Sequence, residues 1–106
     1  MRAAPSFRSP PSAADPVLRE LRERVSEIDR AILAAVNTRL ELVSEIVRHK
    51  QATGRPLHDA GREESMLREL LRANRGRLTD DGVAELQASL LYLTKRQLGI
   101  AASVGR

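Results

Sequence analysis

Two cations in the first half of the chain, Arg39 and Lys50, have the types and the spacing that suit the binding of a small anion. They are eleven residues apart. That is about three turns of an α-helix, so one helix would carry both on one face, about 16 Å apart along its axis. Long side chains at that separation can converge on one anion between them. Either residue alone would ordinarily be a solvated surface charge, but the pair on one face predicts a binding site.

The segment "GRPLHDAGREESML", residues 54–67, supplies acidic groups. Asp59, Arg62 and Glu63 follow the spacing i, i+3, i+4 and would share one side of a helix that begins near Asp59. Asp is a preferred N-cap residue, and an Arg beside a Glu often forms a surface ion pair. Two interpretations therefore stay open for this segment: a capped helix start with solvated charges, or a cluster that holds a ligand.

A third cation, Arg22, lies 17 residues before Arg39, or roughly 25 Å along a continuous helix. It cannot reach the same anion from the same chain. If two long helices pair antiparallel, however, Arg22 of one copy can approach Arg39 and Lys50 of the other. The spacing therefore allows a site built from two chains.

One long helix is expected to position these cations. Apolar residues recur at intervals of three and four, with no Gly or Pro before Gly54, which predicts a helix over residues 17–52. Its length, roughly 54 Å, exceeds the width of a compact domain of this mass. The rest of the chain cannot bury it, so the pattern predicts an oligomer. The apolar stripe consists of Leu18, Leu21, Val25, Ile28, Ile32, Val36, Leu40, Val43 and Val47.

Two shorter helices are expected after a break at "ATGRP", where Gly54 suits a helix C-terminus and Pro56 cannot continue the hydrogen-bond ladder. The second helix begins near Asp59 and ends around residues 74–76. The third begins after Thr79, a capping residue followed by two acids, and continues to about Ile100. Its expected apolar stripe is Val83, Leu86, Leu90, Leu93 and Leu98. With no strand pattern and no internal repeat, the fold class is all-α, a three-helix chain.

The composition limits the domain organisation and the partners. Residues 1–16 hold four of the five prolines and no continuous apolar run. We therefore expect a disordered N-terminal tail without signal peptide or membrane span, one domain over residues 17–100, and a flexible C-terminus at residues 101–106. The net charge of +4 is spread over alternating signs and aromatic residues are nearly absent, so nucleic acid is not an expected partner.

Metal and disulfide chemistry is not expected either. The chain has no Cys, and its two histidines, His49 and His58, lack the spacing of a zinc motif. A reducing cytoplasmic location fits this composition, and we expect no metal and no cofactor.

The stretch "LRERVSEIDRAILAAVNTRLELVSEIVRHKQATGRPLHDAGREESML" resembles the all-helical chorismate mutase family. It has that family's L-R-E-x-[IV]-x-x-[IL]-D start, an Arg in mid-helix, a Lys near the helix end and then [RP]-[VL]-x-D-x-x-R-E. The resemblance covers about residues 18–98 and is strongest over 18–67. It implies an isomerase of the shikimate pathway and aromatic amino-acid biosynthesis that converts chorismate to prephenate. It also implies an intertwined homodimer in which each active site takes one arginine from the neighbouring subunit.

The family's functional residues can be carried over position by position. The resemblance implies that Arg22 is the arginine donated across the dimer, that Arg39 binds a substrate carboxylate and that Lys50 contacts the ether oxygen. Asp59 and Glu63 match the acidic residues around the ring hydroxyl.

Arg62 matches an arginine of the same turn as Glu63. The third helix matches less well, and it places Thr94 where a serine usually contacts substrate. Leu98 occupies the place of a glutamine that gives the ether oxygen its second hydrogen bond. With Lys50 alone at that oxygen, we expect a rate roughly 100-fold to 1,000-fold below that of efficient members. Some small members are activated by binding the synthase that begins the shikimate pathway, which makes such a synthase a candidate partner here.

Two other functions remain open. The first is a sister reaction on the same fold, either rearrangement of 4-amino-4-deoxychorismate or elimination of pyruvate from isochorismate. Asp59 and Glu63 favour chorismate because acidic groups suit its 4-hydroxyl. The second is a non-catalytic helical dimer that acts as an interaction or regulatory module.

Overall fold

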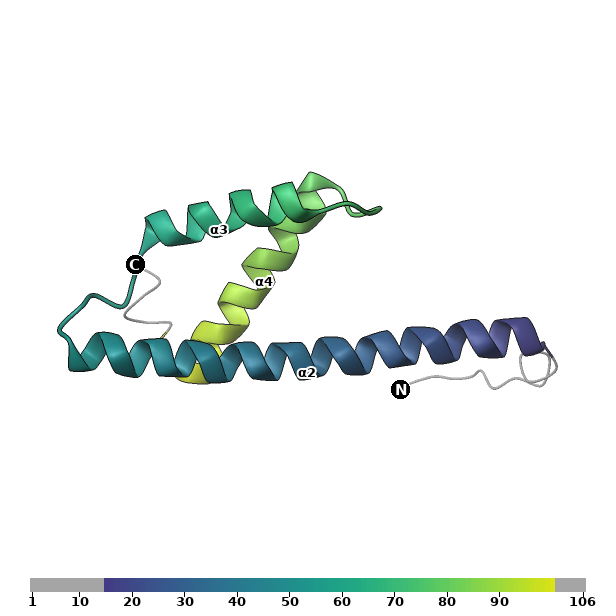
Figure 1. Cartoon of the computed structure of the whole chain (residues 1–106), viewed down its shortest axis with the longest axis horizontal. Helices are drawn as coiled ribbons and strands as arrows, with labels where there is room; N and C mark the ends of the chain where they lie inside the picture. The colour runs from purple at the N-terminus through teal and green to yellow at the C-terminus, as the bar shows by residue number, and fades with distance from the viewer. Residues whose placement is uncertain (1–14, 101–106) are drawn as a thin grey trace. The chain divides into compact units, whose positions relative to one another are not determined.

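The computed structural model describes residues 15–100, which contain three helices and no strand (Figure 1). Helix α2 spans Pro16–Ala52, α3 spans Ala60–Ala73 and α4 spans Asp80–Leu98. The all-α class and the three predicted helices are confirmed. The tail expected at residues 1–16, apart from residues 15 and 16, and the flexible end expected at 101–106 lie outside the described residues. Within the described range, no helix combines the length and the apolar character needed to cross a bilayer.

Helix α2 starts one residue earlier than predicted, at Pro16, a residue that the first turn of a helix tolerates. The Asp15 side chain caps this end by accepting a hydrogen bond from the Leu18 backbone N–H at 3.1 Å. The other end follows the prediction. Gly54 has the left-handed φ of 71°, and the next residue, Arg55, donates its N–H to the Lys50 carbonyl at 2.8 Å.

Helix α2 contributes to two compact units, residues 1–35 and 36–106. In the first unit, the stripe residues Val25, Ile28 and Ile32 are each more than half exposed. No residue of α2 is buried along its whole length. The single chain therefore leaves this part of the predicted apolar stripe open to solvent, whereas the stripe residues from Val36 to Val47 are half-buried.

In the second unit, α3 packs against α4. Asp59 caps α3 by accepting from the Arg62 backbone N–H at 2.9 Å, and Thr79 caps α4 by accepting from the Gly82 N–H at 3.0 Å. Both caps were predicted from the sequence. Val83 of α4, 4% exposed, is the one buried apolar residue among those that the structure describes.

The buried face of α4 differs from the predicted stripe. The buried residues of α4 are Val83, Gln87 and Thr94, whereas Leu86 and Leu93 are exposed. Of the other stripe residues, Leu90 and Leu98 are half-buried in the single chain. The helix carries leucines on several sides, so apolar spacing alone did not identify the side that packs against the rest of the unit.

Replacing Gly54 with Ala should lower the free energy of unfolding by about 1–2 kcal/mol, because a Cβ is strained at left-handed φ. Nothing lies within 4 Å of a Cβ placed there, so backbone strain alone sets the cost. Urea denaturation measures the change. Gly76→Ala is the matched control, since its surroundings are equally open and its φ is not positive. Equal losses in both variants would contradict this explanation.

Candidate functional site

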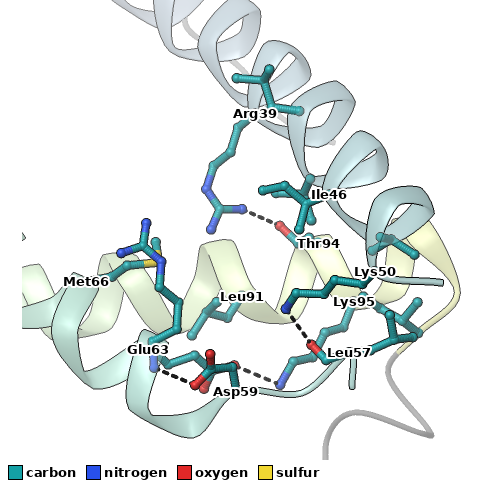
Figure 2. Close-up of a pocket in the computed structure, with 15 residues that line it drawn as sticks. Arg39, Ile46, Lys50, Leu57, Asp59, Glu63, Met66, Leu91, Thr94 and Lys95 are labelled. Carbon is teal, nitrogen blue, oxygen red and sulfur yellow. Dashed lines mark hydrogen bonds and ion pairs between the residues drawn. The ribbon is translucent and has the colours of Figure 1, made fainter. Parts of the chain in front are cut away.

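A hollow of about 460 Å³ lies in the unit formed by residues 36–106, where side chains from α2, α3 and α4 face one another (Figure 2). Four cations and two acids line it, so its charge is net positive. Apolar side chains complete the wall, among them Val43, Ile46, Met66 and Leu91. Such a pocket suits an anionic ligand with an apolar body. The charged lining residues are Arg39, Lys50, Arg62, Lys95, Asp59 and Glu63.

Arg39 is held by Thr94, which is 6% exposed. The Thr94 hydroxyl donates its hydrogen to the Leu90 carbonyl at 2.6 Å and accepts one from Arg39 Nη1 at 2.5 Å. Because the single hydroxyl hydrogen is used by Leu90, the oxygen is free to accept only, which matches the guanidinium. Figure 2 shows Arg39 reaching from α2 to Thr94. One of the five guanidinium N–H groups makes this bond, so Thr94 holds one side of the guanidinium.

Lys50 enters the same hollow from the last turns of α2. Its Nζ donates to the Leu57 carbonyl at 3.3 Å (Figure 2). The turn at Gly54 makes this contact possible, because it reverses the chain and brings Leu57 back beside the end of the helix. The ammonium is half-buried at the pocket wall, where a charge interacts with a ligand more strongly than in open solvent.

The start of α3 serves two purposes. The backbone cap made by Asp59 confirms the first interpretation of "GRPLHDAGREESML". Asp59, Arg62 and Glu63 also line the hollow together with Arg39 and Lys50, as the second interpretation requires. The two interpretations were therefore not exclusive. Six of the eight predicted site residues line this one hollow: Arg39, Lys50, Asp59, Arg62, Glu63 and Thr94.

Two predicted residues are not among those that line the hollow. Leu98, the last residue of α4, lines a separate hollow beside Leu40 and Ser44 of α2. Arg39 and Leu40 project about 100° apart on α2, so Leu98 and Thr94 meet different sides of that helix. Arg22 is exposed and belongs to the unit of residues 1–35.

Two residues of α4 that the sequence did not single out contact Glu63. Lys95 Nζ lies 3.8 Å from Glu63 Oε2, and the buried Gln87 donates from Nε2 to the Glu63 main-chain carbonyl at 3.0 Å. One signal was available for Gln87: it follows Val83 by four residues and precedes Leu91 by four, so it is a polar residue on an apolar helix face. Lys95 had no such signal.

Metal ligation has no support in the described part of the chain. No group of three or more His, Asp or Glu side chains within residues 15–100 is arranged to hold a metal ion. The hollow instead offers hydrogen-bond donors and positive charge, which bind carboxylates directly.

Comparison with protein families gives one match. Residues 21–97 match the family described as chorismate mutase type II. The matched span includes every charged residue of the hollow and ends just before Leu98. No curated protein and no solved structure gives a significant match.

Replacing Thr94 with Val should lower the free energy of unfolding by about 1–2 kcal/mol, because Arg39 loses its acceptor while the side-chain volume is nearly unchanged. Thr94→Ser is the matched control: it keeps the hydroxyl and should retain most of the stability. Chemical denaturation of both variants measures the difference. A Thr94→Val variant as stable as the wild type would contradict a stabilising role for this hydrogen bond.

Proposed function

Because the chain belongs to the chorismate mutase type II family, we propose that it is an isomerase that rearranges chorismate to prephenate. The observation that carries the proposal is the hollow at residues 39–100, where Arg39 and Lys50 of α2 share one space with Asp59 and Glu63 at the start of α3. This arrangement combines sites for carboxylates with acceptors for a hydroxyl, and chorismate carries both groups.

The reaction needs restraint and charge stabilisation more than it needs acid or base chemistry. A C–O bond of the substrate breaks as a C–C bond forms within the same molecule, so no nucleophile and no proton transfer is required. The protein must hold the flexible enolpyruvyl arm over the ring and stabilise the negative charge that grows on the ether oxygen. A preorganised cationic pocket performs both tasks.

Arg39 and Lys50 are assigned the two main roles. The guanidinium of Arg39 can bind a carboxylate through two parallel hydrogen bonds while Thr94 holds its other end. Lys50 is placed at the ether oxygen, where its attraction strengthens as charge develops in the transition state. In this assignment Thr94 orients Arg39, a role that differs from direct contact with substrate.

The acidic residues are assigned to the ring hydroxyl. Glu63 accepts a hydrogen bond from it and orients the ring, and it is not a general base. Asp59 contributes negative charge at the same end while it caps α3. Lys95 adds a second lysine to the hollow. Leu98 is left out of the proposed site because it lines a different hollow.

A second copy of the chain is proposed to complete the site. The α2 stripe is exposed from Leu21 to Ile32 in the single chain, and covering this part would remove apolar surface from water. A homodimer in which the long helices pair antiparallel would bring Arg22 of the partner subunit toward Arg39 and Lys50, as the spacing along the helix requires. That cation would bind the second carboxylate.

Turnover of chorismate should be measurable by loss of its absorbance with identification of the product. Prephenate is the expected product, and Arg39→Ala and Lys50→Ala should each lower kcat/KM by roughly 100-fold or more. Arg48→Ala is the matched control, because Arg48 is an exposed cation of α2 that bonds to Ser44 and does not line the hollow.

The same assay separates the rival functions. Incubation with 4-amino-4-deoxychorismate and isochorismate tests the sister reactions, and addition of the first synthase of the shikimate pathway tests for an activating partner. No turnover of any substrate, with or without that synthase, would leave the helical interaction module as the better account.

Sharing of the site between chains is tested by mixing two inactive variants, Arg22→Ala and Lys50→Ala, after unfolding and refolding together. If Arg22 acts across the dimer, half of the dimers are mixed and each mixed dimer has one intact site, so about a quarter of the wild-type activity should return. Separately refolded variants serve as the control. If activity does not return although mixed dimers form, Arg22 does not act on the partner's site.

A further inference from the structure

We propose that Gln87 and Lys95 of α4 are positioning residues that together hold Glu63, the first by its main chain and the second by its carboxylate. The inference rests on the proposed function, in which Glu63 faces the ring hydroxyl of the substrate. It assigns α4 a role that neither the family match nor the sequence pattern gives it.

The first contact fixes the backbone of Glu63. Gln87 Nε2 donates to the Glu63 carbonyl at 3.0 Å, and the Gln87 side chain is only 6% exposed. A buried amide needs hydrogen-bond partners, so this contact also accounts for a polar residue on the packed face of α4. Glu63 lies in the first turn of α3, where helices tend to fray. The bond from Gln87 ties that turn to α4.

The second contact fixes the side chain. Lys95 Nζ lies 3.8 Å from Glu63 Oε2, and the two side chains are 21% and 31% exposed. Figure 2 shows Lys95 and Lys50 reaching the same hollow from different helices, with the Glu63 carboxylate beside Lys95. A carboxylate with a fixed cation on one side has fewer rotamers to lose when it binds a ligand.

The two contacts act at different points of one residue. Gln87 and Lys95 are eight residues apart, about 12 Å along α4, so the first holds the main chain and the second holds the end of the side chain. With both its main chain and its carboxylate held, the Glu63 side chain has a better-defined orientation than either contact alone would give it. Small displacements of a substrate-orienting group lower the rate strongly.

A double-mutant cycle tests the Lys95 contact in the full-length protein. Lys95→Met should lower kcat for chorismate about three- to tenfold, and Lys95→Arg should restore most of it, since Arg keeps the charge. In a Glu63→Gln background, Lys95→Met should change kcat less than about twofold, because the group it positions has lost its charge. Arg96→Met, on an exposed neighbour stacked over Tyr92, is the control and should leave kcat unchanged.

Gln87→Leu tests the main-chain contact. It should lower kcat about tenfold with a smaller change in KM, because the hydrogen bond to Glu63 is lost. Gln97→Leu makes the same exchange at an exposed position of α4 and should have no such effect. Circular dichroism checks that Gln87→Leu folds. If it does not fold, Lys95→Met still tests the positioning of Glu63, because Lys95 is partly exposed and its replacement should not prevent folding.

The outcomes separate this inference from the proposed function. An undiminished effect of Lys95→Met in the Glu63→Gln background would mean that Lys95 acts on the substrate itself, which overturns the positioning role. Normal kcat in both Lys95→Met and Gln87→Leu would overturn it as well, while leaving the mutase assignment intact. A wild-type protein that turns over no chorismate would overturn the proposed function first.

Discussion

The hydrogen bond from Arg39 to Thr94 joins the first and last helices at the site, and much of the pocket depends on it. The Thr94 hydroxyl can accept from Arg39 because its hydrogen is donated to Leu90 one turn earlier. A single buried hydroxyl thus determines where a cation projects into the hollow. Without it, Arg39 would be one more long, solvated side chain on α2.

The chain builds this site with very little apolar core. One apolar residue among the described ones is buried, and α2 buries none. Polar contacts therefore carry an unusual share of the organisation: Lys50 binds the loop before α3, and Gln87 binds the first turn of α3. Such hydrogen bonds orient the side chains and loops that they join more than they add to the free energy of unfolding. A homodimer that covers the α2 stripe would supply the hydrophobic free energy that the single chain lacks.

Local signals predicted the helices, and they selected six residues that line one hollow. Asp59, Thr79 and Gly54 mark helix ends through chemistry confined to a few residues, and each acts as predicted. The six predicted residues that line the hollow were found because a helix converts spacing into a shared face. The packed face of α4 was not predictable in this way, since leucines on several sides make its apolar pattern ambiguous.

Contacts between side chains of different helices also could not be predicted from the sequence. Whether Lys95 reaches Glu63, or Leu98 reaches the pocket, depends on the rotation of α4 against α2 and α3. That rotation is set by side-chain packing across the whole unit. The sequence around Lys95 and Leu98 contains no local feature that reports this rotation, so the contact between Lys95 and Glu63 was not predicted.

The central claim is that residues 39–100 form a pocket for a dicarboxylate in its reactive conformation. Calorimetric titration with a stable bicyclic dicarboxylate that mimics the chair-like transition state tests it most directly, because such mimics bind more tightly than the substrate by at least about 100-fold. We expect one mimic to bind per chain, with binding greatly weakened in Arg39→Ala and unchanged in Arg48→Ala. Absence of binding to the wild-type protein, or equal binding to all three proteins, would contradict it.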